Sequence, residues 1–458
     1  MKVLLLKPKV LGNPWIPLGL ASIAAFIRKE GIEVKIVDAN VVDLNKDKLA
    51  LIIKTFKPEI IGTGGMTIQY GDVLNIGALV KSVAPQIPLV YGGVHFTFFP
   101  QDGLKYGDIC VFGEGEETFL EICGETDRKK IKGIAFKEDK EIIRTEERPL
   151  IPDLDKIPFP AYDLLNINAY KDYLITREKA ISMMTGRGCP YNCVFCASPQ
   201  LWKRKVRVHS LEYVFEHIDL LIKNYSLKNL RIMDDTFTLN KKRVYDFCDK
   251  IEEHRFKLKM TCLTNVRNAD YDLFKRMKEV GFAIVAFGIE SGNNEILQKI
   301  NKGITIEEAR KAVEMAKKAG LRTELLFMVG NIGETKQTII DSIKLANKLN
   351  PIGSNFDRWY QIRRYNVFQF ATPSPGSKFN EIAKDYGTVV DENYEGYNHT
   401  RPVFIPHGLD EKTMIKLQDI ALLWTNKYPP KWLTRVTKTL KEQRFLKFLY
   451  KKLLNRFE

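Results

Sequence analysis

The stretch GRGCPYNCVFCASP, residues 186–199, decides how the rest of the chain is interpreted. It places Cys189, Cys193 and Cys196 within eight positions, a spacing that lets one short loop supply three thiolates to an iron–sulfur cubane. The fourth iron of such a cluster stays open to a small chelating molecule, and the ring of Phe195 can cover the cluster. A structural zinc site is the alternative, but zinc usually needs four Cys or His ligands in paired spacing, and no matching pair lies nearby in the sequence.

The part of the chain around the cysteine loop alternates apolar runs with helical patterns. Between about residues 181 and 370 the apolar runs are ISMMT, LRIMDD, LKMTCL, AIVAFGIE, ELLFMVG and VFQFAT. This alternation predicts an α/β fold, here a partial parallel β/α barrel over residues 166–380. Ligands of such barrels bind at the carboxyl ends of the strands, and the cysteine loop follows the first of these strands.

The N-terminal part repeats this rhythm with shorter elements and predicts a doubly wound, Rossmann-like domain over residues 1–130. Glycines and their neighbours follow the predicted strand ends, where backbone without a Cβ atom can approach a ligand closely. We expect a ligand crevice lined by Gly64, Gly65, Met66, Gly92, Gly93, Glu114 and Gly115. A hairpin and a linker with four prolines are expected in residues 131–165, and a helical region in residues 381–458.

These motifs, in the order in which they occur, resemble the radical S-adenosylmethionine (SAM) superfamily, and within it the members with an N-terminal cobalamin-binding domain. The resemblance covers nearly the whole chain up to about residue 380, in the segments PLGLASIAAFIRKEG, YGGVHFTFFP, FGEGEETFLEI, GRGCPYNCVFCASP, RIMDDTF, FGIESGN and FMVGNIGET. Similar proteins include the anaerobic magnesium-protoporphyrin ester cyclase, hopanoid-modifying enzymes and cobalamin-dependent radical methylases. The resemblance implies three cofactors: a [4Fe-4S] cluster on the three cysteines, SAM and cobalamin.

Strand ends of the predicted barrel carry the residues that the resemblance assigns to SAM. These residues are Asp234, Asp235, Glu290, Ser291, Gly330, Asn331, Ile332 and Gly333. The aspartates would lie near the amino end of SAM, Glu290 and Ser291 at the ribose, and the glycine-rich turn along the adenine. Arg267, after the third strand, is a further candidate for the carboxylate end. Carboxylates suit ammonium and hydroxyl donors. The structural alternatives are a helix cap for the aspartates, an ion pair for Glu290 and a tight turn for the GNIGET segment.

Cobalamin binding rests on the resemblance more than on any one residue. A doubly wound domain with glycine loops could equally hold a nucleotide or act as a scaffold. None of the six histidines lies in the Asp-x-His-x-x-Gly sequence that supplies an axial cobalt ligand in some cobalamin proteins. His95 is expected to be a loop or core histidine whose nitrogens are hydrogen-bonded, so cobalamin without a histidine ligand is expected.

The implied activity is reductive cleavage of SAM to a 5'-deoxyadenosyl radical, followed by methyl transfer to an unactivated carbon. The alternatives are a radical cyclase or rearrangement enzyme acting on a lipid or tetrapyrrole, and a non-catalytic redox or cobalamin sensor. A methylthiotransferase is disfavoured because Cys110 and Cys123 are the cysteines available in the N-terminal half, one short of a second cluster trio. No cysteine follows Cys262, which disfavours auxiliary clusters in a C-terminal domain.

The charge of the chain is +15, from 71 Lys and Arg against 56 Asp and Glu. More than half of this excess lies between residues 427 and 458, in a basic amphipathic stretch that could pack on the barrel or lie on anionic lipid. We expect a cytoplasmic protein, with membrane association through this stretch as the alternative. The expected partners are a small-molecule or lipid substrate and a one-electron donor of the flavodoxin or ferredoxin type, with no nucleic acid. Residues 350–365 depart from the family pattern, with arginines that could line a substrate entrance or a solvated loop.

Overall fold

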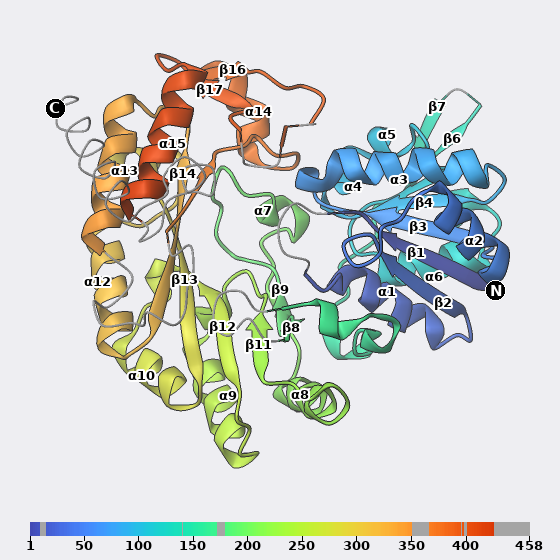
Figure 1. Cartoon of the computed structure of the whole chain (residues 1–458), viewed down its shortest axis with the longest axis horizontal. Helices are drawn as coiled ribbons and strands as arrows, with labels where there is room; N and C mark the ends of the chain where they lie inside the picture. Colours follow the sequence, from blue (N-terminus) through green and yellow to red (C-terminus); the bar gives the residue numbers. More distant parts are fainter. Residues whose placement is uncertain are drawn as a thin grey trace, which may run out of the picture.

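The structure of the protein is a computed structural model that describes residues 1–9, 15–139, 141–171, 179–349, 366–394, 396–397 and 401–425. The described chain forms two α/β units that lie side by side, with α7 (Ser198–Leu201) and β9 (Gly186–Arg187) on the side of the barrel that faces the N-terminal unit (Figure 1). Residues 350–365 and the basic stretch after residue 425, for which loops or helices were expected, lie outside the described residues.

The N-terminal unit is a seven-stranded sheet with the order β2-β1-β3-β4-β5-β6-β7. Strands β1 to β5 run parallel, and helices lie on both faces of the sheet (Figure 1). Its elements are β1 (Lys2–Lys7), α1 (Leu18–Arg28), β2 (Glu33–Asp38), α2 (Lys46–Phe56), β3 (Ile60–Gly64), α3 (Tyr70–Val83), β4 (Leu89–Gly92), α4 (Val94–Phe98), α5 (Pro100–Gly103), β5 (Ile109–Val111) and α6 (Glu116–Gly124).

Strand β1 shows why this sheet is covered on both faces. Its four central residues are apolar and fully buried. Val3 and Leu5 pack in a cluster with residues of α1 and α6, whereas Leu4 and Leu6 pack in a second cluster with residues of α2 and α3. Successive side chains of a strand point to opposite faces, so an unbroken apolar run requires a layer of helices on each side.

The hairpin β6 (Ile134–Glu138) and β7 (Glu141–Arg144) belongs to the same sheet. Strand β6 pairs antiparallel with β5, and β7 pairs antiparallel with β6. The hairpin that we placed beside the linker therefore extends the N-terminal sheet. The domain boundaries drawn from the sequence otherwise stay a prediction.

The second unit is a six-stranded, fully parallel sheet with the order β15-β14-β13-β12-β11-β8. All six strands predicted from the apolar runs are present, which confirms the partial barrel. Its elements are β8 (Ala180–Met183), α8 (Leu211–Tyr225), β11 (Asn229–Ile232), α9 (Lys241–Glu253), β12 (Lys259–Thr264), α10 (Tyr271–Glu279), β13 (Phe282–Glu290), α11 (Asn294–Lys299), α12 (Ile306–Lys318), β14 (Arg322–Val329), α13 (Lys336–Leu349) and β15 (Asn366–Phe370).

The helices of the barrel are amphipathic and capped. Helix α8 buries Val214, Phe215, Ile218 and Leu221, one face at helical spacing, against the strands, and the hydroxyl of its N-cap Ser210 accepts from the Tyr213 N–H. Helix α12 begins with a capping box formed by its N-cap threonine and a glutamate three residues later. These features fix each helix on the outer face and leave the carboxyl ends of the strands free to carry the site.

The described C-terminal part consists of α14 (Lys378–Tyr386), a short hairpin of β16 (Gly387–Val389) and β17 (Phe404–Pro406), and α15 (Glu411–Thr425). Helix α15 packs against α13 and β15 of the barrel. In the same region Tyr394 reaches the N-terminal unit, where its ring lies 5.0 Å from the His95 ring. Among the described residues, no helix combines the length and the apolar character needed to cross a membrane.

The segment between the two units is packed into both of them. Ile16 and Tyr170 belong to the apolar core of the barrel, although Ile16 precedes α1. The Tyr170 hydroxyl donates to Asp38 Oδ2 at the end of β2, with 2.7 Å between the oxygens. The Ala161 N–H donates to the Ala21 carbonyl oxygen, and the N–O distance is 3.0 Å. These contacts fix the carboxyl ends of the two sheets relative to one another.

Candidate functional site

The three cysteines lie on one loop between β9 and α7 and are half-buried. Burial raises the pKa of Cys193, an effect that nearby Lys302 opposes. Burial also raises the pKa of Cys196 to about 12. The Ser198 N–H, which donates to Cys196 Sγ at 3.4 Å, acts in the opposite direction and lowers this pKa. Each of these two thiolates is further disfavoured by the charge of the other cysteines on the loop.

This arrangement fits an iron–sulfur cluster. Three thiolates crowded in a half-buried loop repel one another, and bound iron removes that repulsion because it neutralises each thiolate. Among the described residues, no three His, Cys, Asp or Glu side chains come close enough together to hold a single metal ion. In a cubane each cysteine binds a different iron atom.

The cysteine loop is held in place by the surrounding barrel. The Val194 N–H donates to the Ile300 carbonyl oxygen at 2.9 Å, and the Phe379 N–H donates to the Val194 carbonyl oxygen at 2.8 Å. The Tyr191 hydroxyl donates to Asn268 Oδ1 at 3.0 Å. Bonds on both sides of the loop fix the thiols before any metal is bound.

The two aspartates after β11 face different partners. Both oxygens of Asp234 accept from Thr185, one from its N–H at 2.6 Å and the other from its hydroxyl at 2.5 Å. Burial raises the pKa of Asp234 to about 6 in spite of these bonds. Asp235 Oδ2 instead accepts from the Ser198 hydroxyl at 2.6 Å, next to Cys196. Asp234 therefore supports the start of the cluster loop, whereas Asp235 is the carboxylate nearer to the thiols.

Arg267 also supports the cluster loop. Its guanidinium carbon lies 5.1 Å from the centroid of the Tyr191 ring, and its Nε donates to the Gly303 carbonyl oxygen. Its assignment to the carboxylate end of SAM stays a prediction.

At the end of β13 the structure brings together Glu290 and a lysine that the sequence analysis did not single out. Lys302 Nζ lies 2.9 Å from Glu290 Oε1, and both side chains are about nine-tenths buried. The same ammonium group is 5.4 Å from the centroid of the Phe195 ring in the cluster loop. Burial lowers the pKa of Lys302, but Glu290 and Cys193 raise it more, so the lysine is held charged. Lys302 thus places a cation between the ribose candidate and the thiols.

Glu290 itself adopts a positive φ of 72° at a shift in the pairing of β13 with β14. A non-glycine residue in this region is uncommon and costs free energy, which marks the strand end as a specialised position. The next residue, Ser291, is fully buried, and its hydroxyl lies 3.4 Å from the Ser342 hydroxyl of α13. The two ribose candidates therefore differ, because Ser291 is oriented toward a helix.

The turn after β14 contains buried polar atoms without a partner among the described residues. The backbone N–H of Gly330 and the backbone N–H of Asn331 both donate to Glu334 Oε2, at 2.6 and 3.0 Å. The other Glu334 oxygen and both polar atoms of the Asn331 side chain are buried and unpaired in the described structure. Buried polar atoms are nearly always hydrogen-bonded, so this turn is suited to a polar ligand such as the adenine of SAM.

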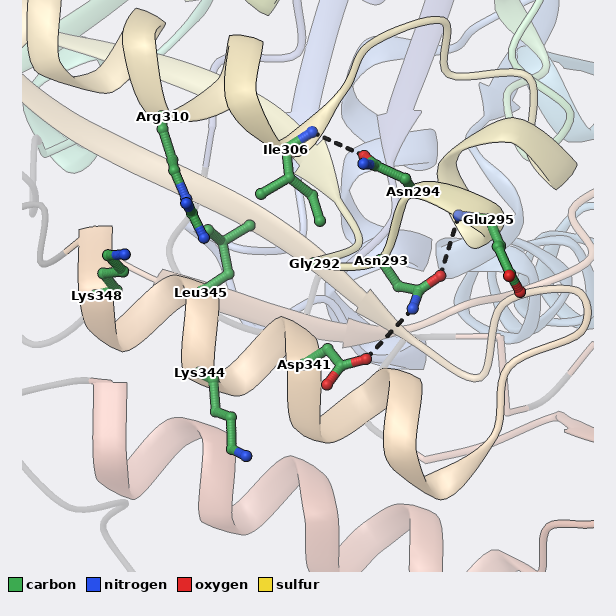
Figure 2. Close-up of a pocket in the computed structure, with 10 residues that line it drawn as sticks. All are labelled: Gly292, Asn293, Asn294, Glu295, Ile306, Arg310, Asp341, Lys344, Leu345 and Lys348. Carbon is green, nitrogen blue, oxygen red and sulfur yellow. Dashed lines mark hydrogen bonds between the residues drawn. The ribbon is translucent and has the colours of Figure 1, made fainter. Parts of the chain in front are cut away.

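A cavity of about 500 Å³ lies behind the β13–α11 loop, between helices α11, α12 and α13 (Figure 2). Asn293 and Asp341 face each other in it, with Asn293 Nδ2 donating to Asp341 Oδ2 at 3.3 Å. None of the three cysteines lines this cavity. It is therefore separate from the candidate site.

In the N-terminal unit, glycines allow two strand ends to meet. A Cβ atom on Gly64 would lie 2.1 Å from the Gly92 carbonyl oxygen, and one on Gly93, at φ 97°, would lie 2.7 Å from the Gly65 carbonyl oxygen. The carboxyl ends of β3 and β4 thus form a surface of bare backbone.

Two exposed apolar side chains follow strands of this sheet. Met66, after β3, is 54% exposed, and Trp15, after the neighbouring strand β1, is 45% exposed. The Trp15 ring lies 4.4 Å from the guanidinium carbon of Arg231 in the barrel strand β11. A backbone platform with exposed apolar side chains at the carboxyl edge of a doubly wound sheet fits a large planar cofactor such as a corrin.

His95 is not available to such a cofactor. It is fully buried, its Nδ1 lies 3.2 Å from Thr67 Oγ1, and its Nε2 lies 3.1 Å from Asp102 Oδ2. Both ring nitrogens are therefore engaged, which confirms the expectation of a core histidine.

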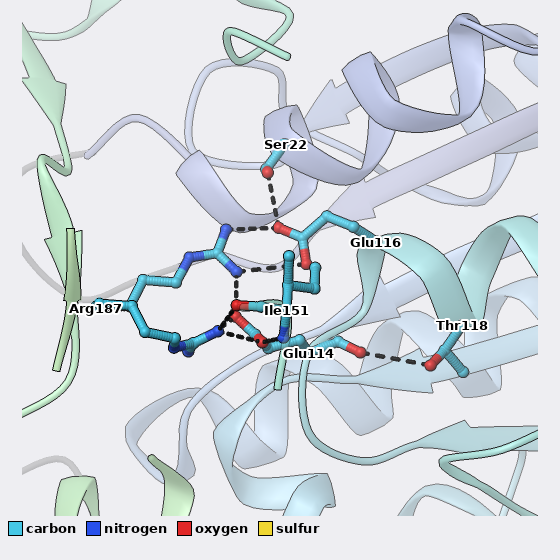
Figure 3. A network of polar contacts seen from close by, with 7 residues as sticks. Ser22, Glu114, Glu116, Thr118, Ile151 and Arg187 are labelled. Atoms are coloured by element: carbon cyan, nitrogen blue, oxygen red, sulfur yellow. Dashed lines mark hydrogen bonds and ion pairs between the residues drawn. The ribbon is translucent and has the colours of Figure 1, made fainter. Parts of the chain in front are cut away.

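Glu114, expected at the ligand crevice, forms ion pairs with two arginines of the second unit, and its role at the crevice stays a prediction. Its carboxylate pairs with Arg187 at 2.6 Å and with Arg207 at 2.8 Å, and the neighbouring Glu116 pairs with Arg187 at 2.6 Å (Figure 3). Sequence analysis did not single out the two arginines, since a charge pair between distant segments leaves no local pattern. The preceding residue Gly113, at φ 79°, has open space around its Cα.

The chain matches two protein-family models, the radical SAM superfamily over residues 183–346 and the B12-binding domain over residues 9–123. An uncharacterised methyltransferase of Pyrococcus horikoshii is 36% identical over 88% of this chain and 87% of the relative. The anaerobic magnesium-protoporphyrin IX monomethyl ester cyclase of Rubrivivax gelatinosus is 28% identical over 91% of this chain and 75% of the cyclase.

Among solved structures, the cobalamin-dependent SAM radical enzyme OxsB, with aqua-cobalamin bound, superposes with a TM-score of 0.75 at 15% identity, over 99% of this chain and 72% of that chain. This likeness shows that the two units have the same fold and order as in OxsB. The two domain matches and the methyltransferase relative show that the chain belongs to the radical SAM superfamily, among its members with an N-terminal B12-binding domain.

Proposed function

We propose that this enzyme transfers a methyl group from SAM to an unactivated carbon of a small molecule. Its family supplies the cofactors, which are a [4Fe-4S] cluster, SAM and cobalamin. The observation that carries the proposal is the direct contact between the two cofactor units. Arg187, two residues before the first cysteine, is ion-paired at 2.6 Å with Glu114, which follows strand β5 of the B12-binding domain. A relative at 36% identity that is described as a methyltransferase supports the same activity.

When bound, the cofactors would supply the chemistry: the cluster would provide the electron that splits one SAM into methionine and a 5'-deoxyadenosyl radical, and cobalamin would carry a methyl group taken from a second SAM. The chain supplies the positions. We propose that Cys189, Cys193 and Cys196 hold the cluster and that Glu290 and Lys302 fix the polar end and ribose of SAM. The site then lies between two packed units, which excludes bulk water from reactive species.

The proposal also names the residues that would bind the adenine of SAM and the source of the electron that reduces the cluster. The unpaired polar atoms of Asn331 and Glu334 would bind the adenine, since both are buried without a partner in the described structure. We propose that the electron that reduces the cluster comes from a one-electron donor of the flavodoxin or ferredoxin class. The substrate is a small molecule or lipid.

A second candidate function is a radical cyclisation without net methylation. The magnesium-protoporphyrin ester cyclase matches 91% of this chain, so the same fold serves that chemistry in a relative.

The experiment uses anaerobically purified enzyme, reconstituted with iron, sulfide and cobalamin and supplied with reductant, methyl-deuterated SAM and a small-molecule extract. Methylation predicts release of 5'-deoxyadenosine together with a product that gains the labelled methyl group, detected by mass spectrometry. A cyclase would release 5'-deoxyadenosine and give a product without label. The Cys193→Ala variant, which removes one cluster ligand, is the control and should release no 5'-deoxyadenosine. If it acts like the native enzyme, the radical mechanism is wrong.

A further inference from the structure

Four buried charges join the strand that leads into the cluster loop to the B12-binding domain (Figure 3). Arg187 lies in β9, and Arg207 lies in β10 (Arg207–Val208), which pairs antiparallel with β9. Glu114 lies in the loop after β5, and Glu116 is the first residue of α6. We call these four residues the interdomain clamp.

The clamp is a set of close, mutually supporting contacts. Arg187 donates to Glu114 Oε1 and to Glu116 Oε1, both at 2.6 Å. Arg207 donates to Glu114 Oε2 at 2.8 Å and to the Ile151 carbonyl oxygen at 2.5 Å, and the Ile151 N–H donates to Glu114 Oε2 at 2.7 Å. Each carboxylate therefore accepts from more than one donor, and each arginine binds more than one acceptor, so the geometry is fixed on both sides.

The clamp is sealed from solvent and neutral. The exposed fractions of the side chains are 3% for Glu114, 5% for Glu116, 14% for Arg187 and 10% for Arg207. Two carboxylates balance two guanidinium groups. Loss of one member would leave a buried charge without its partner, so neither domain can move away from the other without disrupting the set.

The neighbouring residue Glu117 offers a contrast within the same helix. It pairs at 3.4 Å with Arg148, which comes from the segment after the hairpin of the same sheet, and its side chain is 43% exposed. Two adjacent glutamates thus differ in their role, because Glu116 faces the barrel and Glu117 stays within its own unit.

The connection from the clamp to the first cluster ligand is short and rigid. Gly188 alone separates Arg187 from Cys189, and it adopts φ 102°. A Cβ atom there would lie 2.0 Å from the Lys205 carbonyl oxygen. The backbone at Gly188 therefore packs directly against the backbone that leads into β10. Arg187 and Cys189 are therefore fixed to the same part of the barrel.

We propose that Glu114, Glu116 and Arg187 are positioning residues that set the distance and orientation of the iron–sulfur cluster relative to cobalamin. The inference rests on the proposed function, since methyl transfer requires the radical centre and the methyl carrier to reach the same substrate atom. A looser clamp leaves SAM cleavage intact, because the thiols and the SAM site belong to the barrel alone. Methyl transfer then falls, and a 1 Å misplacement of reacting groups costs on the order of 100-fold in rate.

The test compares Glu116→Gln and Glu114→Gln with the control Glu117→Gln, which removes the same charge one position away. The enzyme is loaded with both cofactors, the cluster is reduced, and the spin–spin interaction between cob(II)alamin and the cluster is measured by electron paramagnetic resonance. We expect one defined interaction in the native enzyme and in Glu117→Gln, and a weaker or broadly distributed one in the two clamp variants. Release of 5'-deoxyadenosine should stay within about twofold of the native rate, whereas methylated product falls on the order of 100-fold.

A milder variant guards against a failure to fold. Glu116→Asp keeps the charge and shortens the side chain by one methylene, and it should give an intermediate interaction. Native interaction and native product ratio in both glutamine variants would overturn the proposal, as would loss of folding in every clamp variant, which would make the clamp a stability element. Failure of the proposed function gives a different result, since a native enzyme that transfers no label can still show the spin–spin interaction and its dependence on Glu116.

Discussion

Lys302 and Glu290 form a buried ion pair at the point where the barrel strand β13 meets the cluster loop. Sequence analysis identified Glu290 by its place in the FGIESGN motif but did not identify Lys302, which lies twelve residues later, between α11 and α12. A single lysine among several carries no spacing signal. The cysteine trio could be predicted because its chemistry is local, whereas pairs between distant positions require the fold.

We predict that Lys302→Met destabilises the protein by roughly 3–5 kcal/mol, because it leaves the Glu290 carboxylate buried without its partner. The double variant Lys302→Met/Glu290→Gln should recover part of this loss, since no charge is then left unpaired. Denaturant unfolding of both variants checks the difference in free energy. Lys311→Met, at an exposed position of α12, is the control and should stay within about 0.5 kcal/mol of the native protein. Equal stability of the single and double variants would contradict the prediction.

The burial of Glu334 makes the stability of the folded protein depend on pH. Burial raises its pKa to about 7 from the usual 4.5, although the Asn331 and Gly330 N–H groups act in the opposite direction. Between these two pH values the unfolded chain has released this proton and the folded chain has kept it. The folded state therefore binds more protons, and its stability falls as the pH rises from about 4.5 to 7.

We predict that Glu334→Gln, which has no proton to lose, gains stability relative to the native protein between pH 5 and pH 8. The difference in melting temperature between variant and native protein, measured at both pH values, checks this sign. A difference that does not change with pH would show that the Glu334 carboxyl group titrates normally in the folded state.

At the scale of elements, the long strands and helices could be predicted from the sequence, whereas the short elements that connect them could not. The six barrel strands and the N-terminal sheet could be predicted, because segments such as VLLL and AIVAFGIE are apolar runs of strand length that alternate with helical patterns. Strands β9 and β10 contain two residues each and could not be predicted, since two residues form no recognisable run. Their pairing nevertheless carries Arg187 and Arg207, and it depends on the backbone of Gly188.

We predict that Gly188→Ala disrupts this connection. Its φ of 102° costs an alanine roughly 1–2 kcal/mol, and the added Cβ atom would clash with the Lys205 carbonyl oxygen. The iron content per chain after anaerobic reconstitution should fall well below the native value, and so should the melting temperature. Gly19→Ala is the matched control, because a Cβ atom there meets nothing within 4 Å in α1, and it should be neutral or stabilising by about 0.4–1 kcal/mol.

At the scale of the whole molecule, the two units meet near Trp15, which is 45% exposed and whose ring lies 4.4 Å from the guanidinium carbon of Arg231 in the barrel. We predict that hydroxocobalamin raises the melting temperature of the native protein, since a ligand at 100 times its dissociation constant stabilises by about 2.7 kcal/mol. Trp15→Ala should reduce this shift because it removes an apolar contact for the corrin.

The control for this experiment is Ile415→Ala, which truncates a similarly exposed apolar residue, 39% exposed, on α15. It should leave the cobalamin-dependent shift unchanged. An equal shift in Trp15→Ala and the native protein would place the corrin away from Trp15.

The interdomain clamp also constrains the order in which the molecule assembles during synthesis. Glu114 and Arg187 lie 73 positions apart, so the B12-binding domain leaves the ribosome well before its basic partner. Domains generally fold as units, with the N-terminal one first. Until β9 emerges, Glu114 and Glu116 must therefore remain hydrated on the surface of the young domain, and their dehydration occurs when the barrel docks.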